Sequence, residues 1–277
     1  MMNLRTSVLA AALALAAFTT PALAGKGGSA AAIRTAIASH SSDAIIAEVE
    51  RAESLACGEC VQLVTALTES DRYEVREVAG WWFAKRPGLA KPLSEGFLQE
   101  LASGNGTTVR NAADFLGSTV TYAALPGLQA AIARDVGTEA KLAIVRAIAS
   151  LGHRDGVATL RIAMTDANAS VRAAGVSAWR ELRDVTDGTP LVGALTDADA
   201  TVRAVAATAV GALTTLGARG ALETLVISDP DAQVRRNAAW ALGKLGVAAS
   251  RPVLVAASAD RSGLVRMTAK AALASLK

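Results

Sequence analysis

The chain has 277 residues and a formal net charge of +3, and 52% of its residues are hydrophobic. Its Lys and Arg residues are spread along the chain, which argues against the concentrated basic surface that nucleic-acid binding requires. Its length alone would allow two globular domains.

Residues 1–24 have the features of a secretory signal peptide. Arg5 supplies a positive charge, residues 8–18 form an apolar run, and residues 22–24 (Ala-Leu-Ala) form a small-residue cleavage site. The run is too short for an uncleaved anchor across a bilayer, and no Cys follows the cleavage site, as a lipoprotein would require. We expect a mature protein in a bacterial periplasm or secreted, with no integral membrane segment, that begins with a short flexible lead at residues 25–28.

Beyond the lead, a pattern of about 31 residues repeats, which is typical of stacked helical hairpins. Its most regular feature is a Val-Arg or Ala-Lys pair, which we call the anchor pair. In five repeats an Asp lies five residues before the anchor, and mostly small residues lie four residues after it. The anchor pairs are Val75-Arg76, Val109-Arg110, Ala140-Lys141, Val171-Arg172, Val202-Arg203, Val234-Arg235 and Val265-Arg266.

The clearest helix of the pattern covers residues 229–246. Asp229 or Asp231 can cap its first turn, and Gly246 can end it. Its apolar residues recur with the period of a helix: Val234, Ala238, Leu242 and Leu245. A helix this short and alanine-rich is not stable alone, so it needs neighbours of the same shape.

The order of Asp, Val-Arg, Ala, Ala-Leu-Gly and Leu-Gly resembles the HEAT-like repeats of phycobilisome lyases. The resemblance covers residues 58–277, and residues 29–56 resemble one degenerate, capping repeat. It implies an all-α fold, a right-handed α-solenoid of about eight helical hairpins over residues 29–277. It says little about function, because such repeats occur in proteins with many roles.

No enzymatic activity follows from the resemblance. Phycobilin lyases attach a tetrapyrrole to a client protein, and an exported protein would meet neither. Deoxyhypusine hydroxylase has a similar architecture and binds two irons through His-Glu pairs, but His40 and His153 have no such partners at helical spacing. We therefore expect no cofactor, no metal and no catalysis.

Cys57 and Cys60 form a Cys-x-x-Cys sequence, placed by the repeat at a turn before a helix over residues 61–68. A c-type haem is excluded, because Val61 rather than His follows Cys60. A thioredoxin-type redox pair belongs between a strand and a helix, whereas the surroundings here are helical. We favour a local disulfide in an oxidising compartment, although so small a loop adds little stability. A metal clip and free thiols stay open.

The basic residues of the anchor pairs allow two interpretations. Seven of them in the same repeat position could form a row of anion-binding sites. In repeats of this kind, however, such an Arg commonly bonds to the acidic turn of its own or a neighbouring repeat. The matching Asp series favours this structural role, and we expect Arg235→Ala to lower stability.

Positions two, three and six after each anchor should face outward on the second helix of each hairpin, along a concave surface. Position six holds several aromatic residues, which favours a binding surface for a protein or peptide, although the rings could instead pack against neighbouring repeats. Trp82 and Phe83 are assigned to the core. The candidate binding residues form two groups: Glu77, Val78, Trp81 and Phe115, and Arg236, Asn237 and Trp240.

The sequence thus predicts an exported, non-enzymatic scaffold for a protein or peptide partner. One alternative is a redox-responsive or accessory enzyme component that uses Cys57 and Cys60. Another is a structural envelope protein that associates end to end.

Overall fold

The computed structural model describes residues 28–276, which are helical and contain no strand. The proposed signal peptide lies outside the described residues. Eight consecutive helix pairs account for the described part of the chain, so the predicted all-α architecture of stacked hairpins is confirmed. The helices form two compact units, residues 28–151 and residues 152–276. Within residues 28–276, no helix combines the length and apolar character that crossing a bilayer requires.

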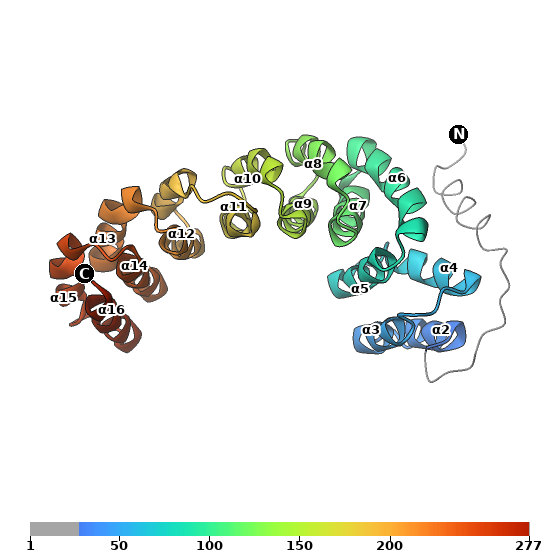
Figure 1. Ribbon diagram of the computed structural model, residues 1–277, viewed down its shortest axis with the longest axis horizontal. Helices are drawn as coiled ribbons and strands as arrows, with labels where there is room; N and C mark the ends of the chain where they lie inside the picture. Colours follow the sequence, from blue (N-terminus) through green and yellow to red (C-terminus); the bar gives the residue numbers. More distant parts are fainter. Residues whose placement is uncertain (1–27, 277) are drawn as a thin grey trace. The chain divides into compact units, whose positions relative to one another are not determined.

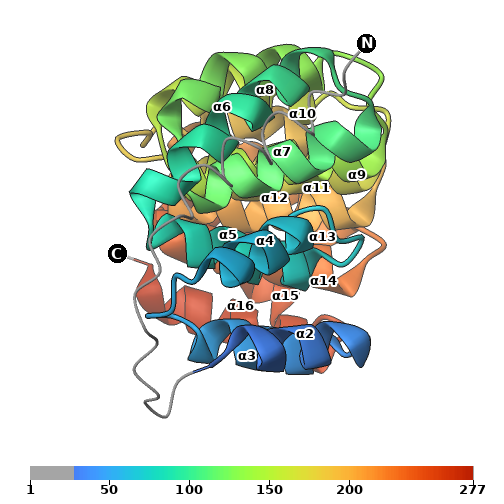
Figure 2. The same ribbon diagram turned by 90° about the vertical axis from the view of Figure 1, so that its right-hand side faces the viewer.

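Unit 1 consists of four helix pairs. In chain order its elements are α2 (Ala30–Ala38), α3 (Ser42–Arg51), α4 (Gly58–Leu67), α5 (Tyr73–Ala84), α6 (Pro87–Ser103), α7 (Gly106–Ser118), η1 (Tyr122–Ala124), α8 (Leu125–Ile132) and α9 (Thr138–Leu151). The second helices α3, α5, α7 and α9 pack in a row, and the pair α2–α3 lies at one end beside α4 and α5 (Figure 2).

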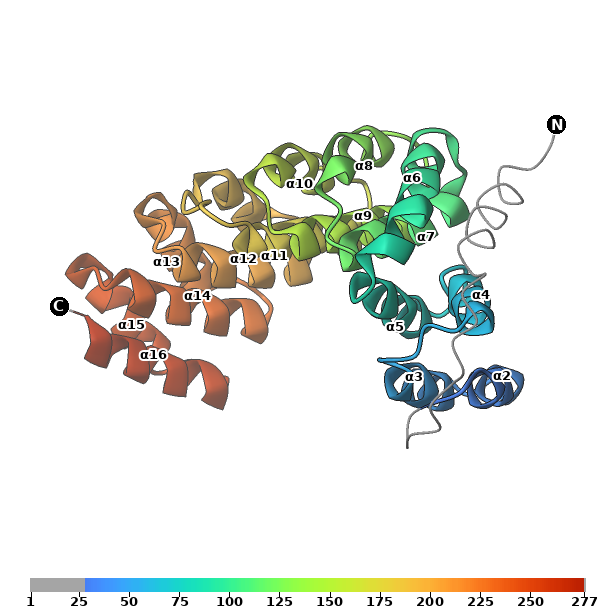
Figure 3. The same cartoon turned by 45° about the vertical axis from the view of Figure 1, so that its right-hand side comes forward.

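Unit 2 also consists of four helix pairs, and short 3₁₀ turns join several of its helices. Its elements are η2 (Arg154–Gly156), α10 (Val157–Ala163), α11 (Ala169–Ala178), η3 (Trp179–Glu181), η4 (Thr189–Thr196), α12 (Ala200–Ala212), η5 (Leu216–Ala218), α13 (Arg219–Ser228), α14 (Ala232–Leu245), η6 (Ala248–Ser250), α15 (Arg251–Ala257) and α16 (Gly263–Ser275). Here α11, α12, α14 and α16 form the row of second helices, with α13 beside α14 and α15 beside α16 (Figures 1 and 3).

Helix α14 shows how local sequence sets the ends of a second helix. The Asp231 carboxylate accepts the backbone N–H groups of Gln233 and Val234, two of the donors that a helix start leaves unsatisfied. Gly246 adopts φ 68°, a left-handed conformation that favours glycine, and ends the helix. Asp231 is therefore the cap, and Asp229 is left free to contact the preceding repeat.

Helix α6 contains two prolines. It begins at Pro87 and continues through Pro92. Pro87 occupies the first helical turn, where a missing N–H costs nothing. The bond that Pro92 cannot donate would go to Gly88, which is exposed to solvent, so water can satisfy that carbonyl group.

Candidate functional site

The anchor arginines of unit 2 connect successive repeats. Arg235 donates from Nε to Asp260 Oδ2 over 2.8 Å and from Nη1 to the Asp229 carbonyl oxygen over 2.8 Å. It therefore joins its own turn to the carboxylate of the following turn. The same arrangement links Arg172 to Asp197 and Arg203 to Asp229. These guanidinium groups are engaged by the protein, so the structural role is confirmed and the row of anion sites is wrong for this part of the chain.

Each aspartate of this series accepts hydrogen bonds both from the preceding repeat and from its own turn. Besides the arginine, its Oδ1 accepts the backbone N–H of the residue two positions on, at 2.7–2.9 Å. The bond from Arg235 is the main cause of a lowered pKa at Asp260, and Arg172 lowers the pKa of Asp197 in the same way. Charge-assisted bonds of this kind hold the second helices at fixed positions.

The anchor pair of helix α7 lies one residue further along its helix than the anchor pairs of the other repeats. In the other second helices from α5 onward the first anchor residue is the third helical residue, but Val109 is the fourth residue of α7. The glycines at which neighbouring second helices approach closely indicate the same displacement of one residue. A methyl group on Gly117 would lie 2.8 Å from the Cα atom of Ala147, and the equivalent pairs are Gly211 with Ala241 and Gly243 with Ala272. Those glycines lie nine residues after the anchor, so Thr108, not Val109, is the equivalent residue in α7.

This displacement corrects the prediction for Phe115. Counted from Thr108, position six of α7 is Asp114, and Phe115 is turned by about 100° toward the first helices. Its ring is 2% exposed and packs at 4.7 Å from the Phe97 ring and 5.6 Å from the Phe83 ring. The expectation that Phe115 lies on the surface is therefore wrong.

Asp114 instead holds a buried charge cluster between three second helices. Arg76 from α5 donates to Asp114 Oδ2 over 2.7 Å, and Arg146 from α9 donates to Oδ1 over 3.0 Å. The Arg146 guanidinium stacks over the Tyr73 ring at 4.3 Å. Burial, followed by the nearby Glu77 carboxylate, raises the pKa of Tyr73 to about 12, so its hydroxyl stays protonated and donates to Glu77. The cluster closes this face of α7 to ligands.

The remaining candidates of the first group separate into buried and accessible residues. Val78 is 7% exposed and belongs to the core, so its assignment to a surface is wrong as well. Glu77 is exposed, and Trp81 is partly exposed with the Lys85 ammonium 5.2 Å from its ring centre. Trp82 and Phe83 are buried, as predicted. Without Phe115 and Val78, this group forms no contiguous apolar patch.

The second group lies together on the second-helix face of unit 2. Arg236, Asn237 and Trp240 are all partly exposed on α14. They line a cavity of about 390 Å³ whose other side is α16, with the apolar side chains of Leu264 and Met267. Leu264 is 56% exposed and Met267 is 67% exposed. These three predicted residues therefore lie on an accessible, partly apolar surface.

This cavity shares lining residues with two others, and we call the three together the unit 2 groove. Thr208 and Asn237 also line a cavity of about 470 Å³ that reaches Ser177 and Arg180 of the α11–η3 segment. Trp240 and Thr268 also line a smaller cavity of about 180 Å³ beside Lys244. The groove thus follows the row α11, α12, α14 and α16.

Close helix packing forms the floor of the groove. Gly211 of α12 has no side chain, and a methyl group there would lie 2.9 Å from Cζ3 of the Trp240 ring. The ring can therefore lie against α12 while it lines the cavities toward α16, and the Lys244 ammonium lies 5.5 Å from its centre. Sequence analysis missed Leu264 and Met267, although Met267 occupies position two of its repeat and the same counting would have found it.

The charges that line the groove are mainly positive. Arg180, Arg236 and Lys244 contribute side chains to its three cavities. The acidic residue that lines it, Asp231, already accepts two N–H groups at the start of α14. A groove with basic and apolar side chains favours a ligand that carries negative charge beside apolar groups.

The cysteine pair lies elsewhere, at the start of α4. Cys57 and Cys60 are joined by a disulfide with their Cα atoms 5.1 Å apart. The helix begins at Gly58, so Cys57 is its cap and Cys60 belongs to its first turn, rather than both lying in a turn before a helix at residue 61. Among the described residues, no three His, Cys, Asp or Glu side chains gather into a group that could hold a metal ion.

Comparison with known families identifies the repeats. A family model described as HEAT repeats matches residues 125–211 and, overlapping, residues 188–274, together more than half of the chain. The chain belongs to the HEAT-repeat family. The matched part of this HEAT-repeat protein begins at α8, after the displaced helix α7, and includes every residue that lines the groove except Ser275.

Solved structures share the fold of this HEAT-repeat protein at low sequence identity. YibA of Escherichia coli is 15% identical with a TM-score of 0.58, and the match covers 98% of this chain and 96% of YibA. A chain from the structure of Kap95p with RanGDP is 14% identical with a TM-score of 0.57, over 89% of this chain and 41% of that one. The CpcE–CpcF complex of phycocyanin lyase from Nostoc is 17% identical, covering 94% and 99%, but its TM-score of 0.39 supports no shared activity. No curated protein matches the sequence significantly.

Proposed function

We propose that this HEAT-repeat protein is an exported scaffold whose unit 2 groove binds an extended, acidic segment of a partner protein and carries out no chemistry. The observation that carries the proposal is a series of three cavities along α11, α12, α14 and α16, each of which shares lining residues with the next. HEAT repeats commonly mediate protein interactions, and Kap95p, which shares the fold, is described as binding RanGDP.

Trp240 is the proposed anchor of the interaction. It is partly exposed, lines two of the three cavities, and has Leu264 and Met267 across the groove. A tryptophan in an otherwise adaptable apolar surface is a common centre of binding energy. We expect an apolar side chain of the partner to insert between Trp240 and Met267.

The flanking charges select an acidic segment. Arg236 lies beside Trp240, with Arg180 toward one end of the groove and Lys244 toward the other. Second helices packed about 10 Å apart give a groove on the order of 30 Å long, which an extended segment of about nine residues would span. A partner segment with Glu or Asp on both sides of a Leu or Phe fits this pattern.

The experiment uses synthetic peptides and the purified mature protein. The first peptide is an acidic nonapeptide with a central Phe, and the second has Lys in place of every acid. Binding is followed by tryptophan fluorescence and calorimetry at several salt concentrations. We expect binding of the acidic peptide that weakens as salt rises, and at least tenfold weaker binding of the basic peptide.

Variants locate the site. Trp240→Ala and Arg236→Ala should each weaken acidic-peptide binding at least tenfold. Trp81→Ala is the matched control, because Trp81 occupies the same repeat position in unit 1 and also has a Lys four residues on. Equal binding of the two peptides, or equal effects of Trp240→Ala and Trp81→Ala, would contradict the proposal.

Export rests on the sequence of residues 1–24. Expression of the full chain in a Gram-negative host, followed by fractionation and N-terminal sequencing, tests it. We expect periplasmic protein that starts at Gly25. Full-length protein in the cytoplasm would contradict the export proposal without affecting the groove.

A further inference from the structure

The Cys57–Cys60 disulfide is placed where it contributes little to holding the fold together. It spans one helical turn, so the loop that it closes is among the smallest possible and restricts the unfolded chain weakly. It joins residues of the same helix start and ties no other element to α4. Holding two elements of the fold together is therefore not its role.

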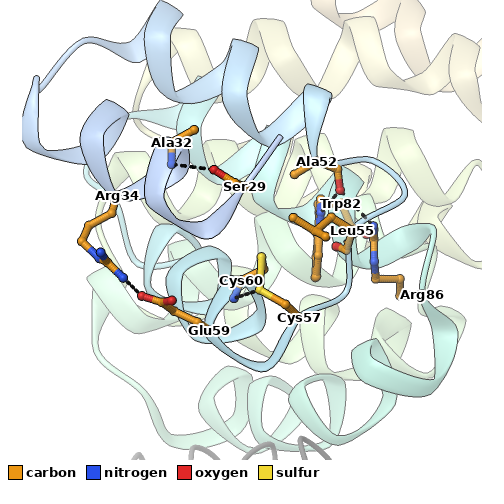
Figure 4. Close-up of a disulfide and its surroundings, with 10 residues drawn as sticks. All are labelled: Ser29, Ala32, Arg34, Ala52, Leu55, Cys57, Glu59, Cys60, Trp82 and Arg86. Atoms are coloured by element: carbon orange, nitrogen blue, oxygen red, sulfur yellow. Dashed lines mark hydrogen bonds and ion pairs between the residues drawn. A yellow bond between two sulfur atoms is a disulfide. The ribbon is translucent and has the colours of Figure 1, made fainter. Parts of the chain in front are cut away.

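The connection between α3 and α4 is already fixed by side chains of α5 and the turn after it. The indole Nε1 of Trp82 donates to the Ala52 carbonyl oxygen over 3.0 Å. Arg86 donates to the carbonyl oxygens of Ala52, Glu53 and Leu55, and its guanidinium stacks on the Trp82 ring at 3.6 Å. Figure 4 shows this support beside the disulfide. The chain leading to Cys57 would therefore keep its place if the disulfide opened.

The two cysteine residues differ in exposure to solvent. Cys60 is fully buried, with 0% exposure, whereas Cys57 is partly exposed at the start of α4. An incoming thiolate can therefore reach Cys57 but not Cys60, which gives the disulfide one point of attack. The backbone N–H of Cys60 donates to Cys57 Sγ over 3.1 Å. That N–H and the positive end of the ten-residue helix α4 favour the thiolate form of Cys57.

From this geometry we propose that Cys57 and Cys60 form a thiol–disulfide exchange site that oxidises a protein dithiol. One thiolate of the dithiol attacks Cys57 Sγ, the Cys57–Cys60 bond breaks, and its electron pair stays on Cys60, which takes up a proton. The second thiolate of the dithiol then attacks the first dithiol sulfur, which is bonded to Cys57 in the mixed disulfide. The S–S bond of the substrate forms, and Cys57 leaves as a thiolate. The dithiol loses two electrons and becomes a disulfide, and the cysteine pair gains both.

Reduction of the folded protein is the first test. The oxidised mature protein is incubated with dithiothreitol without denaturant, its thiols are alkylated and counted by mass, and its helix content is followed by far-UV circular dichroism. We expect two new thiols, unchanged helix content, and faster alkylation of Cys57 than of glutathione at pH 7. Reduction only in denaturant, or loss of the helical signal on reduction, would overturn the proposal.

Two cysteine variants test the direction of attack. Cys60→Ser should form a mixed disulfide with one glutathione at Cys57 when the folded protein meets oxidised glutathione. Cys57→Ser is the matched control, and its buried Cys60 should react only after unfolding. Equal modification of the two folded variants would overturn the proposal. A reduced peptide with two cysteines should be oxidised by the wild-type protein and by neither variant, and absence of that oxidation would also overturn it.

Discussion

Arg235 and Asp260 meet in a two-pronged contact, with Nε 2.8 Å from Oδ2 and Nη2 3.0 Å from Oδ1, across the boundary between two repeats. The two residues are 25 positions apart in the chain, but each lies at the start of a second helix. The side chain of Arg235 is 4% exposed. Because the pair is shielded from water and bonded twice, it should contribute more than an ordinary surface ion pair.

Replacing Arg235 by Ala should lower the free energy of unfolding by roughly 1–3 kcal/mol, because the Asp260 carboxylate and the Asp229 carbonyl group lose a donor. Urea unfolding followed by circular dichroism measures the change. Arg266→Ala is the matched control: Arg266 also donates to the carbonyl of its own turn, Asp260, but its side chain is exposed. A loss at Arg266 as large as at Arg235 would show that the carboxylate contact adds nothing.

The same contacts predict acid sensitivity. The folded-state pKa values of Asp197 and Asp260 are lowered, chiefly by the bonds from Arg172 and Arg235. Groups with depressed folded values stabilise the protein above their unfolded pKa of about 3.9, and this contribution is lost as the pH falls through the folded value. The melting temperature should be level from pH 6 to about pH 4 and fall steeply below. In the Arg235→Ala variant the fall should be shallower, and an identical pH profile would contradict this origin.

Asp114 should be among the most sensitive residues of unit 1. Its side chain is 2% exposed and pairs with the buried Arg76 as well as with Arg146. Asp114→Ala leaves a buried guanidinium without its counter-charge, so we expect a loss of about 3–5 kcal/mol in unfolding free energy. Asp71→Ala removes a carboxylate that is 95% exposed and pairs with Arg110, and should change the stability little. Comparable losses in the two variants would be evidence against the buried cluster.

Gly211→Ala tests the close approach of α12 and α14. The added methyl group would lie 2.8 Å from the Cα atom of Ala241, so backbone must shift, and overpacking of this kind costs about 1–3 kcal/mol. The change should also move Trp240 and shift its fluorescence. Gly220→Ala is the control, because outside the backbone of helix α13 and the adjacent residues no atom lies within 4 Å of the new methyl group. That variant should be neutral or stabilised by up to about 1 kcal/mol.

Much of the candidate site could be predicted because a side chain at a given position of the repeat points in the same direction in each second helix. Arg236, Asn237 and Trp240 were placed by counting from the Val234 anchor, and all three line the groove. Counting failed at Phe115 because one extra residue precedes the anchor in α7. A single residue turns a helix by about 100°, which moves a side chain from the accessible face to the core. The pair Val109-Arg110 matches the anchor pattern well, so the pair itself did not indicate the shift.

The amino-acid sequence alone determined the hairpin architecture, the helix caps and the Arg–Asp series, because each depends on residues at short and regular spacing. Tertiary structure decided which outward positions remain accessible. In unit 1 the side chains of Tyr73, Arg76 and Arg146 converge on Asp114 and close the face of α7, whereas in unit 2 small residues leave the groove beside Trp240 open. That difference arises from contacts between residues about 30 positions apart, and local periodicity carries no information about how such side chains fill the space between helices.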